Sequence, residues 1–316
     1  MRVLVTGAAG FIGSWVCQRL LERGDAVLGL DNFDPFYARS IKQRNLDDCG
    51  AVRAGFAFHE GELCDRAQLD ALLADADAVV HLAALAGVRP SLEAPARYMR
   101  VNVEGTTALL EACRAADVRR LVVASSSSVY GARSRTPFHE DDPCDRPASP
   151  YAASKRATEL VCATHHQLYE LGVSCLRYFT VYGPRQRPEM AIHKFVRRAL
   201  AGEPLEIFGD GGSGRDYTYI DDAVAATLAA LDRQDGGFHV YNVGGSQPVL
   251  LRDLVATIGE VLGVELRLTR LPWQAGDVPI TCADVTRAER ELGFQARVPL
   301  EDGLRRFLGW YRERLG

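Results

Sequence analysis

The sequence predicts an α/β protein built on a doubly wound parallel sheet, with a smaller C-terminal α/β lobe. Apolar runs typical of strands alternate with periodic segments typical of helices over the first 180 residues. A glycine-rich turn follows the first strand, and proline and glycine become denser after about Gly183. Strand–helix–strand units of this kind build parallel sheets, so we expect a Rossmann-type arrangement.

The elements can be assigned in chain order. The first strand is expected in RVLVTG, a helix from Phe11 to Arg23, and the second strand in AVLGL. Further strands are expected in FAFHE, AVVHLAA, RLVVASS and SCLRYF, with helical segments from Glu93 to Ala115 and from Tyr151 to Leu171. We therefore expect a Rossmann domain over residues 1–180, to which some later segments return, and a second lobe over residues 181–316.

Composition excludes several classes of partner. The 316 residues are 47% hydrophobic and 25% charged, which is ordinary for a globular protein. A formal net charge of −4 gives no general attraction to nucleic acid or to an anionic membrane. We therefore expect neither as a partner, and any anionic ligand must be held by local groups.

Cysteine and histidine usage predicts a cytoplasmic protein without a bound metal. The eight cysteines are scattered without close pairs, which is typical of reduced core thiols. The N-terminus shows no charged-then-apolar leader, and no apolar run approaches membrane-spanning length. His165 and His166 are adjacent and face different ways on a helix, so they do not predict a metal site.

The turn after the first strand has the spacing of a dinucleotide-binding turn. VTGAAGFIG places Gly7, Gly10 and Gly13 where the strand ends and the helix begins, so backbone amides and the helix dipole can face a pyrophosphate. Asp31 ends the second strand, where a carboxylate can accept from both ribose hydroxyls and would repel a 2'-phosphate. This favours NAD over NADP. The alternatives are a tight strand–helix turn and a loop carboxylate before Asn32.

A later segment carries candidate proton-transfer chemistry. SPYAASKRATEL opens a helix with Ser149 as the N-cap and Pro150 in the first turn, and it places Tyr151 and Lys155 one helical turn apart on one face. A phenol titrates near 10, and an ammonium beside it lowers that pKa towards neutrality. The alternative is a packed ring beside a solvated lysine stem.

Four serines end the strand that precedes this helix. VVASSSSVYG runs from an apolar strand into Ser125–Ser128 at the carboxyl edge of the sheet, where hydroxyls can relay a proton or hold a sugar. A serine-rich turn without chemistry is the alternative.

With these motifs in place, the chain resembles the extended short-chain dehydrogenases/reductases, specifically nucleotide-sugar 4-epimerases and most closely the UDP-glucuronate 4-epimerases. The resemblance covers nearly the whole length. It is carried, in family order, by TGAAGFIG, DNFDPFY, HLAALAGVRPS, NVEGT, SSSSVYG, YAASK, RYFTVYGPRQRPEMA, RDYTYIDD and AGDVPITCADVTRAERELGF.

The resemblance implies a role for each catalytic candidate. Tyr151 would be the base, Lys155 would lower its pKa and hold the nicotinamide ribose, and Ser126 would relay the proton, with Ser128 as a second candidate. The NAD contacts that it implies come from Gly7, Gly10, Phe11, Ile12, Gly13, Asp31, Asn32, Glu62, Leu63, Leu82, Ala83, Ala84, Asn102, Lys155 and Tyr178, and the uridine diphosphate contacts from Arg215 and Asp277. Glu62 stands where the family usually has Asp, so the contact to adenine is expected to be longer or lost.

The residue before VYG favours epimerisation. Dehydratases and UDP-glucuronate decarboxylases of this superfamily resemble TDEVYG or TSEVYG, whereas this chain has Ser128 in place of the acidic residue. The simplest cycle is then hydride transfer from the sugar C4 to NAD, rotation of the 4-keto sugar and hydride return to its other face. NAD is regenerated in each turnover and is expected to stay bound.

Further differences favour a uronate substrate. Thr180 and Gln274 replace the Asn and Arg that UDP-glucose epimerases usually show at these positions. The residues expected to hold the sugar and its carboxylate are Ser127, Ser128, Tyr151, Thr180 and Arg185, with Arg89 as an outer guard. For the two arginines, a surface position near prolines is the alternative.

Other functions stay open at this point. A UDP-glucose/UDP-galactose 4-epimerase would use the same proton and hydride chemistry, a decarboxylase would release a pentose, and a nucleotide-binding protein could keep the fold without chemistry. The resemblance also implies a homodimer formed through the helices expected at residues 93–115 and 151–171.

Overall fold

A computed structural model describes residues 1–49, 54–132, 135–233, 235–272 and 278–315. By its internal contacts the chain groups into two compact units. Unit 1 comprises residues 1–131, 143–177 and 224–241, and unit 2 comprises residues 132–142, 178–223 and 242–316. The domain boundary expected at residue 180 stays a prediction, since such a grouping does not test whether either part folds alone.

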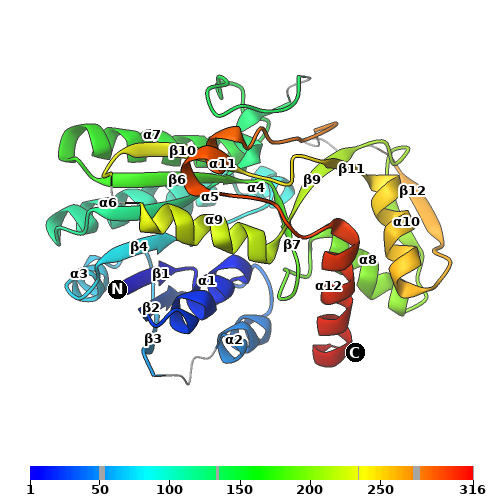
Figure 1. The fold of residues 1–316 in the computed structure, drawn as a ribbon, viewed down its shortest axis with the longest axis horizontal. Coiled ribbons are helices and arrows are strands. Elements are labelled where there is room, and N and C mark those ends of the chain that lie inside the picture. Colours follow the sequence, from blue (N-terminus) through cyan, green and yellow to red (C-terminus); the bar gives the residue numbers. More distant parts are fainter. Residues whose placement is uncertain (50–53, 133–134, 234, 273–277, 316) are drawn as a thin grey trace. The chain divides into compact units, whose positions relative to one another are not determined.

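The centre of unit 1 is a seven-stranded sheet in the order β10-β6-β5-β4-β1-β2-β3 (Figure 1). The pairings of β3 with β2, β2 with β1, β1 with β4 and β4 with β5 are parallel. The doubly wound, Rossmann-type fold class predicted from the sequence is therefore confirmed. The strands are β1 (Arg2–Thr6), β2 (Ala26–Asp31), β3 (Phe56–Glu60), β4 (Ala78–His81), β5 (Arg120–Ser126), β6 (Gly172–Tyr178) and β10 (Phe238–Val243).

The six strands expected from apolar runs are all present, and the structure adds β10. Central strands are covered on both faces, which explains their continuous apolar sequence: Val3, Leu4 and Val5 of β1 are fully buried. β10 lies beside β6, with the amide of Val173 donating to the carbonyl of Gly237. It comes from FHVYNV, between glycine-rich stretches, where a short run does not reveal which sheet it joins.

Helices cover both faces of the sheet (Figure 1). One layer contains α3 (Arg66–Leu73), α6 (Gly105–Ala115) and α7 (Pro150–Tyr169), and its leucines pack with Leu4, Val79 and Val123 of the sheet in one apolar core. The other layer contains α1 (Phe11–Glu22), which buries Val16, Cys17 and Leu20, and α2 (Arg39–Asp48), which packs on α1. Both layers hold the strand ends in place by apolar burial.

The helical segment expected from Glu93 to Ala115 is present, but it begins at Pro95, after a break at Ala94, and contains a π-helical turn. The structure divides this region into α4 (Val88–Glu93), α5 (Pro95–Tyr98), a π-helical turn η1 (Met99–Glu104) and α6. Pro95 begins a new helix because it has no amide to donate and because it keeps the preceding Ala94 out of the helical region, at φ −136°. The π turn carries Asn102, and such turns are frequent at functional sites.

Unit 2 contains two small sheets, in the orders β11-β9-β7 and β12-β8, and the helices that pack on them. Its elements are β7 (Thr180–Tyr182), α8 (Ala191–Leu200), β8 (Leu205–Phe208), β9 (Gly214–Tyr219), β11 (Pro248–Leu250), α10 (Leu251–Leu262), β12 (Leu268–Leu271), α11 (Thr286–Leu292) and α12 (Leu300–Arg314), while α9 (Ile220–Asp232) runs from unit 2 into unit 1. No helix of the described ranges is long and apolar enough to cross a membrane.

One buried carboxylate organises unit 2. Asp216 of β9 accepts from the amides of Gly245 at 2.6 Å, Ser246 at 3.1 Å and Ala283 at 2.8 Å. Burial raises the pKa of Asp216 to about 6, although these hydrogen bonds favour its charge. These three hydrogen bonds fix β9 to the segments that contain Gly245 and Ala283.

The turn after β1 leaves no space for a side chain at Gly13, because a Cβ there would lie 2.0 Å from the carbonyl oxygen of Gly7. We expect Gly13→Ala to lower the free energy of unfolding by roughly 1–3 kcal/mol in urea titrations. Gly309→Ala is the matched control, since Gly309 lies in α12 with open space around it and alanine should raise stability by about 0.5–1 kcal/mol. Equal stability of Gly13→Ala and the wild type would contradict this constraint.

Candidate active site

The strand order reverses between β1 and β4, so the carboxyl ends of these two strands border the crevice where doubly wound sheets bind ligands. The backbones that leave the two strands approach closely there. A Cβ on Gly7, whose φ is +72°, would lie 2.8 Å from the amide nitrogen of Ala83. A Cβ on Gly10 would lie 3.0 Å from the Gly7 carbonyl oxygen. Leu82 and Ala83 therefore lie beside the glycine turn, and Ala84 follows them in the chain.

The N-terminus of α1 is open to an anion. Its N-cap, Gly10, has no side chain to cap the first amides of the helix, which include those of Phe11 and Ile12. Uncapped amides at a helix N-terminus attract a phosphate through both hydrogen bonds and the helix dipole.

Asp31 lies at this turn and is held by three groups. Its carboxylate accepts from the amides of Ala9 at 3.2 Å and Phe33 at 2.8 Å, and from Nζ of Lys42 at 3.1 Å. The Asp31 and Lys42 side chains are 4% and 8% exposed, so the ion pair is buried. The sequence reasoning missed Lys42, because nothing in the DNFDPFY segment indicates that a lysine of α2 returns to the end of β2.

The residues expected near adenine lie together. Nδ2 of Asn32 donates to Oε1 of Glu62 at 3.0 Å, and Leu63 is buried against Gly105 at the start of α6. The longer side chain of Glu62 therefore contacts Asn32 itself. Whether the adenine contact is lost, as the sequence suggests, stays a prediction.

A chain of buried hydroxyls and a histidine joins β1, β4 and η1. Nδ1 of His81 lies 2.7 Å from Oγ1 of Thr6, and Nε2 lies 3.0 Å from Oγ1 of Thr106. Because the Thr106 hydroxyl donates to the Asn102 carbonyl at 2.6 Å, it accepts from Nε2–H of His81. Burial, with a smaller effect of the charge of Lys155, lowers the pKa of His81 to about 3. The His81 ring is therefore neutral, with its proton on Nε2, and its two hydrogen bonds hold the ends of β1 and β4 in place.

Asn102 is buried and its side-chain amide is bonded to the protein. Oδ1 accepts from the amide of Leu85 at 2.8 Å, and Nδ2 donates to the carbonyl of Leu85 at 3.0 Å and to Oγ of Ser154 at 2.9 Å. These bonds fix the segment after β4 to α7. We infer that Asn102 contributes to the site by holding Leu82–Leu85 in place.

Helix α7 carries the proton-transfer candidates. The Ser149 side chain caps it by accepting from the amide of Ala152 at 3.1 Å, and Pro150 is its first residue, which confirms both local predictions. Tyr151 packs edge-to-face on Tyr98, with ring centroids 6.2 Å apart. One turn later, Nζ of Lys155 donates to the carbonyl of Ala124 at 2.7 Å. Burial lowers the pKa of Lys155 to about 8, so it is mostly protonated at neutral pH.

The serine segment reaches the same end of the sheet. Ser126 is the last residue of β5 and caps a 3-10 turn, η2 (Ser127–Tyr130): its Oγ accepts from the amide of Ser128 and lies 3.1 Å from Oγ of Ser128. Ser127 and Ser128 are partly exposed, whereas Ser125 is buried and faces α7. Lys155 therefore holds β5 two residues before Ser126, through its hydrogen bond to the Ala124 carbonyl.

The remaining predicted residues are spread over the two units. Tyr178 ends β6, Thr180 begins β7, Arg185 is buried with φ +67°, and Arg215 of β9 donates to the Gly214 carbonyl at 2.8 Å. All four belong to unit 2. Arg89, expected as an outer guard, lies in α4 of unit 1 and is exposed. Asp277 and Gln274 lie outside the described residues.

These features fit NAD. The three glycines leave a backbone cradle that any Cβ would fill, the start of α1 is uncapped, and Asp31 is a buried carboxylate at the end of β2. NAD would be held by the turn, Asp31 and Lys155, and it would supply a hydride acceptor and donor. Within the described ranges, no three His, Cys, Asp or Glu side chains gather as metal ligands.

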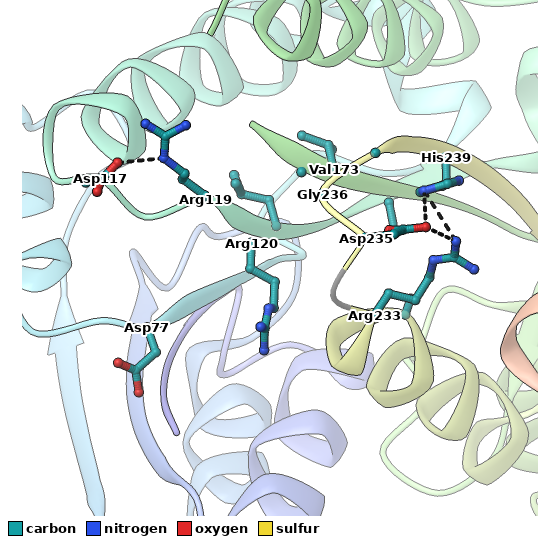
Figure 2. A pocket seen from close by; sticks show the side chains of 14 residues that line it. Asp77, Asp117, Arg119, Arg120, Val173, Arg233, Asp235, Gly236 and His239 are labelled. Atoms are coloured by element: carbon teal, nitrogen blue, oxygen red, sulfur yellow. Dashed lines mark hydrogen bonds and ion pairs between the residues drawn. The ribbon is translucent and has the colours of Figure 1, made fainter. Parts of the chain in front are cut away.

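A separate cavity of about 300 Å³ opens at the amino ends of the strands (Figure 2). Several of its charged groups pair, Arg119 with Asp117 at 2.7 Å and Asp235 with both Arg233 and His239. Figure 2 draws these pairs as dashed lines. Because the cavity lies at the opposite strand ends from the glycine turn, it is not the candidate active site.

Comparison with known proteins places the chain among enzymes of one family. The model of the NAD dependent epimerase/dehydratase family matches residues 3–244. A UDP-glucuronate 4-epimerase of Thermodesulfobacterium geofontis is 40% identical and covers 99% of this chain and 96% of its own length. UDP-glucuronate 4-epimerase 2 of Arabidopsis thaliana is 42% identical over 98% of this chain and 75% of its own. The crystal structure of a UDP-glucuronic acid 4-epimerase from Bacillus cereus, in complex with UDP-glucuronic acid and NAD, superposes with a TM-score of 0.93 at 36% identity over 99% of both chains.

The neutral state of His81 predicts a pH effect on stability. The unfolded chain binds a proton at this histidine below pH 6.5, whereas the folded chain does not until about pH 3. Stability from this residue is therefore present above pH 6.5 and is lost as the pH falls. We expect the stability advantage of the wild type over His81→Gln to shrink by about 1.4 kcal/mol per pH unit below 6.5. Urea titrations between pH 7 and pH 4 measure it, and a difference independent of pH would contradict a neutral, buried His81.

Proposed function

Since the chain belongs to the NAD-dependent epimerase/dehydratase family, we propose that it is a UDP-glucuronate 4-epimerase, which interconverts UDP-glucuronate and UDP-galacturonate. The observation that carries the proposal is the placement of Tyr151 and Lys155 one turn apart on α7, with the carbonyl of Ala124, two residues before Ser126, bonded to Lys155. Relatives that match almost the whole chain bear this name.

The proposed chemistry begins with a proton at C4 of the sugar. Oη of Tyr151 takes the proton of the C4 hydroxyl, directly or through the hydroxyl of Ser126, and returns it at the end of the cycle. Lys155, charged at neutral pH, favours the phenolate because its ammonium lies one turn along the same helix. NAD, when bound, would supply the acceptor and the donor for the C4 hydride. With no acidic residue at position 128, no group there drives chemistry at C5, which favours epimerisation over dehydration.

For a uronate, the 4-keto sugar is a β-keto acid that can lose carbon dioxide. The chain must therefore hold the carboxylate so that its bond to C5 stays unaligned with the new carbonyl. We propose that Arg185 binds this carboxylate, with hydroxyls of Ser127, Ser128 and Thr180 as further donors and Arg89 as an outer guard. A buried guanidinium suits a carboxylate because it presents paired donors. Arg215 and Asp277 are proposed to bind the uridine diphosphate.

The experiment that tests the function uses purified protein without added cofactor, incubated separately with UDP-glucuronate and UDP-glucose, with the products resolved by NMR. We expect UDP-galacturonate from the first and no turnover of the second. UDP-galactose from the second incubation would support the neutral-sugar epimerase instead, and a pentose product would indicate a decarboxylase.

Tyr151→Phe should lower kcat by roughly 10²- to 10⁴-fold, with KM unchanged, because it removes only the proton acceptor.

Arg185→Ala tests carboxylate recognition separately. The variant loses a charged hydrogen-bond donor, so KM for UDP-glucuronate should rise roughly 10- to 100-fold. Initial-rate measurements over a range of substrate concentrations give this value, with the exposed Arg252→Ala of α10 as a control that should keep the wild-type KM. Full glucuronate turnover at low substrate concentration in Arg185→Ala would exclude this role.

We also propose a homodimer that acts in the cytoplasm. Leu160 and Leu168 of α7 are 53% and 62% exposed, and they supply the apolar surface that a partner subunit would cover in this dimer. In the part of the chain that the structure describes, which includes all eight cysteines, no disulfide forms, and this suits a reducing compartment.

The dimer can be tested by changing that helix. Leu160→Glu/Leu168→Glu places two carboxylates on the proposed interface and should give a monomer in size-exclusion chromatography with light scattering. Leu200→Glu is the matched control, because Leu200 of α8 is also exposed, at 43%, but lies on a different helix. A double variant with the same mass in solution as the wild type would exclude an interface through this part of α7.

A further inference from the structure

A buried ion pair joins α7, the helix of the proton-transfer residues, to β6. Glu159 lies one turn after Lys155 on α7, and Arg177 is in β6. Nε and Nη2 of Arg177 donate to the two oxygens of Glu159 at 2.8 and 2.9 Å. The Glu159 and Arg177 side chains are 1% and 2% exposed, so both charges are removed from water.

The two residues of the ion pair also bond to residues on either side of Ser126–Ser128. Oγ of Ser125 donates to Oε1 of Glu159 at 2.5 Å, and Nη1 of Arg177 donates to Oη of Tyr130 at 2.9 Å. Ser125 precedes Ser126, and Tyr130 ends the η2 turn. One carboxylate and one guanidinium thus fix the residues that flank Ser126–Ser128.

The same contacts fix the spacing between β5 and α7. Lys155 donates to the carbonyl of Ala124, and the next residue, Ser125, is held by Glu159 one turn along the helix. The two bonds connect consecutive residues of β5 to consecutive turns of α7. A change in the second bond would therefore alter the position of Ser126 relative to Lys155.

Stability alone does not explain such a pair. Removing two charges from water costs free energy that their attraction often does no more than offset, so apolar residues in their place are frequently as stable. Burial is the largest single effect and opposes the charge of Glu159, but the hydrogen bonds and charge of Arg177, together with the bonds from Ser125 and Arg156, keep the pKa of Glu159 below its ordinary value. Burial also opposes the charge of Arg177, yet the bonds to Glu159 raise its pKa. Both residues stay charged across the neutral range.

We propose that Glu159 and Arg177 are positioning residues of the proposed epimerase. Arg177 of β6 fixes Glu159, and Glu159 holds Ser125 of β5 against α7. Ser126, Tyr151 and Lys155 thereby keep the spacing that proton transfer at C4 requires. The inference rests on the proposed function for its substrate. Misplacement of a reacting group by about 1 Å can cost roughly a hundredfold in rate, so a pair that fixes this spacing affects kcat without touching the sugar.

Three variants separate positioning from stability. Glu159→Gln leaves Arg177 buried without its counter-charge and should lower the thermal midpoint by roughly 5–15 °C. Glu159→Gln/Arg177→Met removes both charges and should return the midpoint close to that of the wild type. Arg156→Gln is the matched control, because Arg156 binds the same carboxylate at 2.8 Å but is 32% exposed, and it should keep kcat within about twofold of wild type.

We expect the double variant to recover stability but not rate. Its kcat for UDP-glucuronate should stay roughly 10- to 100-fold below that of the wild type, with KM and bound NAD unchanged. A double variant that is stable and has the wild-type kcat would overturn the proposal, because the pair would then contribute to stability only.

A second readout needs no substrate. Amide hydrogen exchange at Ser126–Ser128 should be faster in the double variant than in wild type, while exchange in β1 stays unchanged. Equal exchange in the serine segment would contradict the positioning role whatever the substrate is. Failure of the wild type to turn over UDP-glucuronate would instead contradict the proposed function, so the two failures are distinguishable.

Discussion

The constraint on which unit 1 depends is the close approach of backbone to backbone where the sheet order reverses. β1 ends at the glycine turn and β4 ends at His81, and the two exits come so near that a single Cβ on Gly7 would contact the amide of Ala83. With glycine at positions 7 and 13, the turn can bring the start of α1, the carboxylate of Asp31 and the exit of β4 to one place. The candidate cofactor site is a direct consequence of this approach.

Groups removed from water hold the rest of the site in position. His81 stays neutral between two threonine hydroxyls, Asp31 is paired with Lys42, and Lys155 is charged but buried. Each would be costly if its partner were missing, so the network tolerates few alternative arrangements. A reaction that moves a proton between fixed atoms benefits from this rigidity, since positioning accounts for a large part of the barrier that an enzyme removes.

The part of the site that could be predicted from the sequence is the part set by local spacing. Helix geometry puts Tyr151 and Lys155 on one face, a strand followed by a glycine-rich turn predicts the phosphate-binding turn, and Ser149 before Pro150 marks the start of α7. The strand assignments succeeded for the same reason, because buried parallel strands have continuous apolar sequences.

Contacts between residues far apart in the chain could not be predicted in this way. Neither the partner of Asp31 nor the π-helical turn around Asn102 has a local signal, and β10 joins the sheet through pairing with a strand about 60 residues earlier. Glu159 and Arg177 left a weak signal that was missed: Arg177 is a charge inside an apolar strand, and Glu159 continues the face of Tyr151 and Lys155. A buried charge requires a partner, so such residues identify each other once the topology is known.

In the proposed cycle, the hydride at C4 leaves the sugar and returns to the same carbon without exchange with water. Incubation of the wild type with UDP-glucuronate deuterated at C4, in ordinary water, measures this exchange, with the product examined by NMR and mass spectrometry. We expect UDP-galacturonate to retain the deuterium at C4. Replacement of the deuterium by solvent hydrogen would contradict hydride transfer to a bound cofactor and would require a different mechanism.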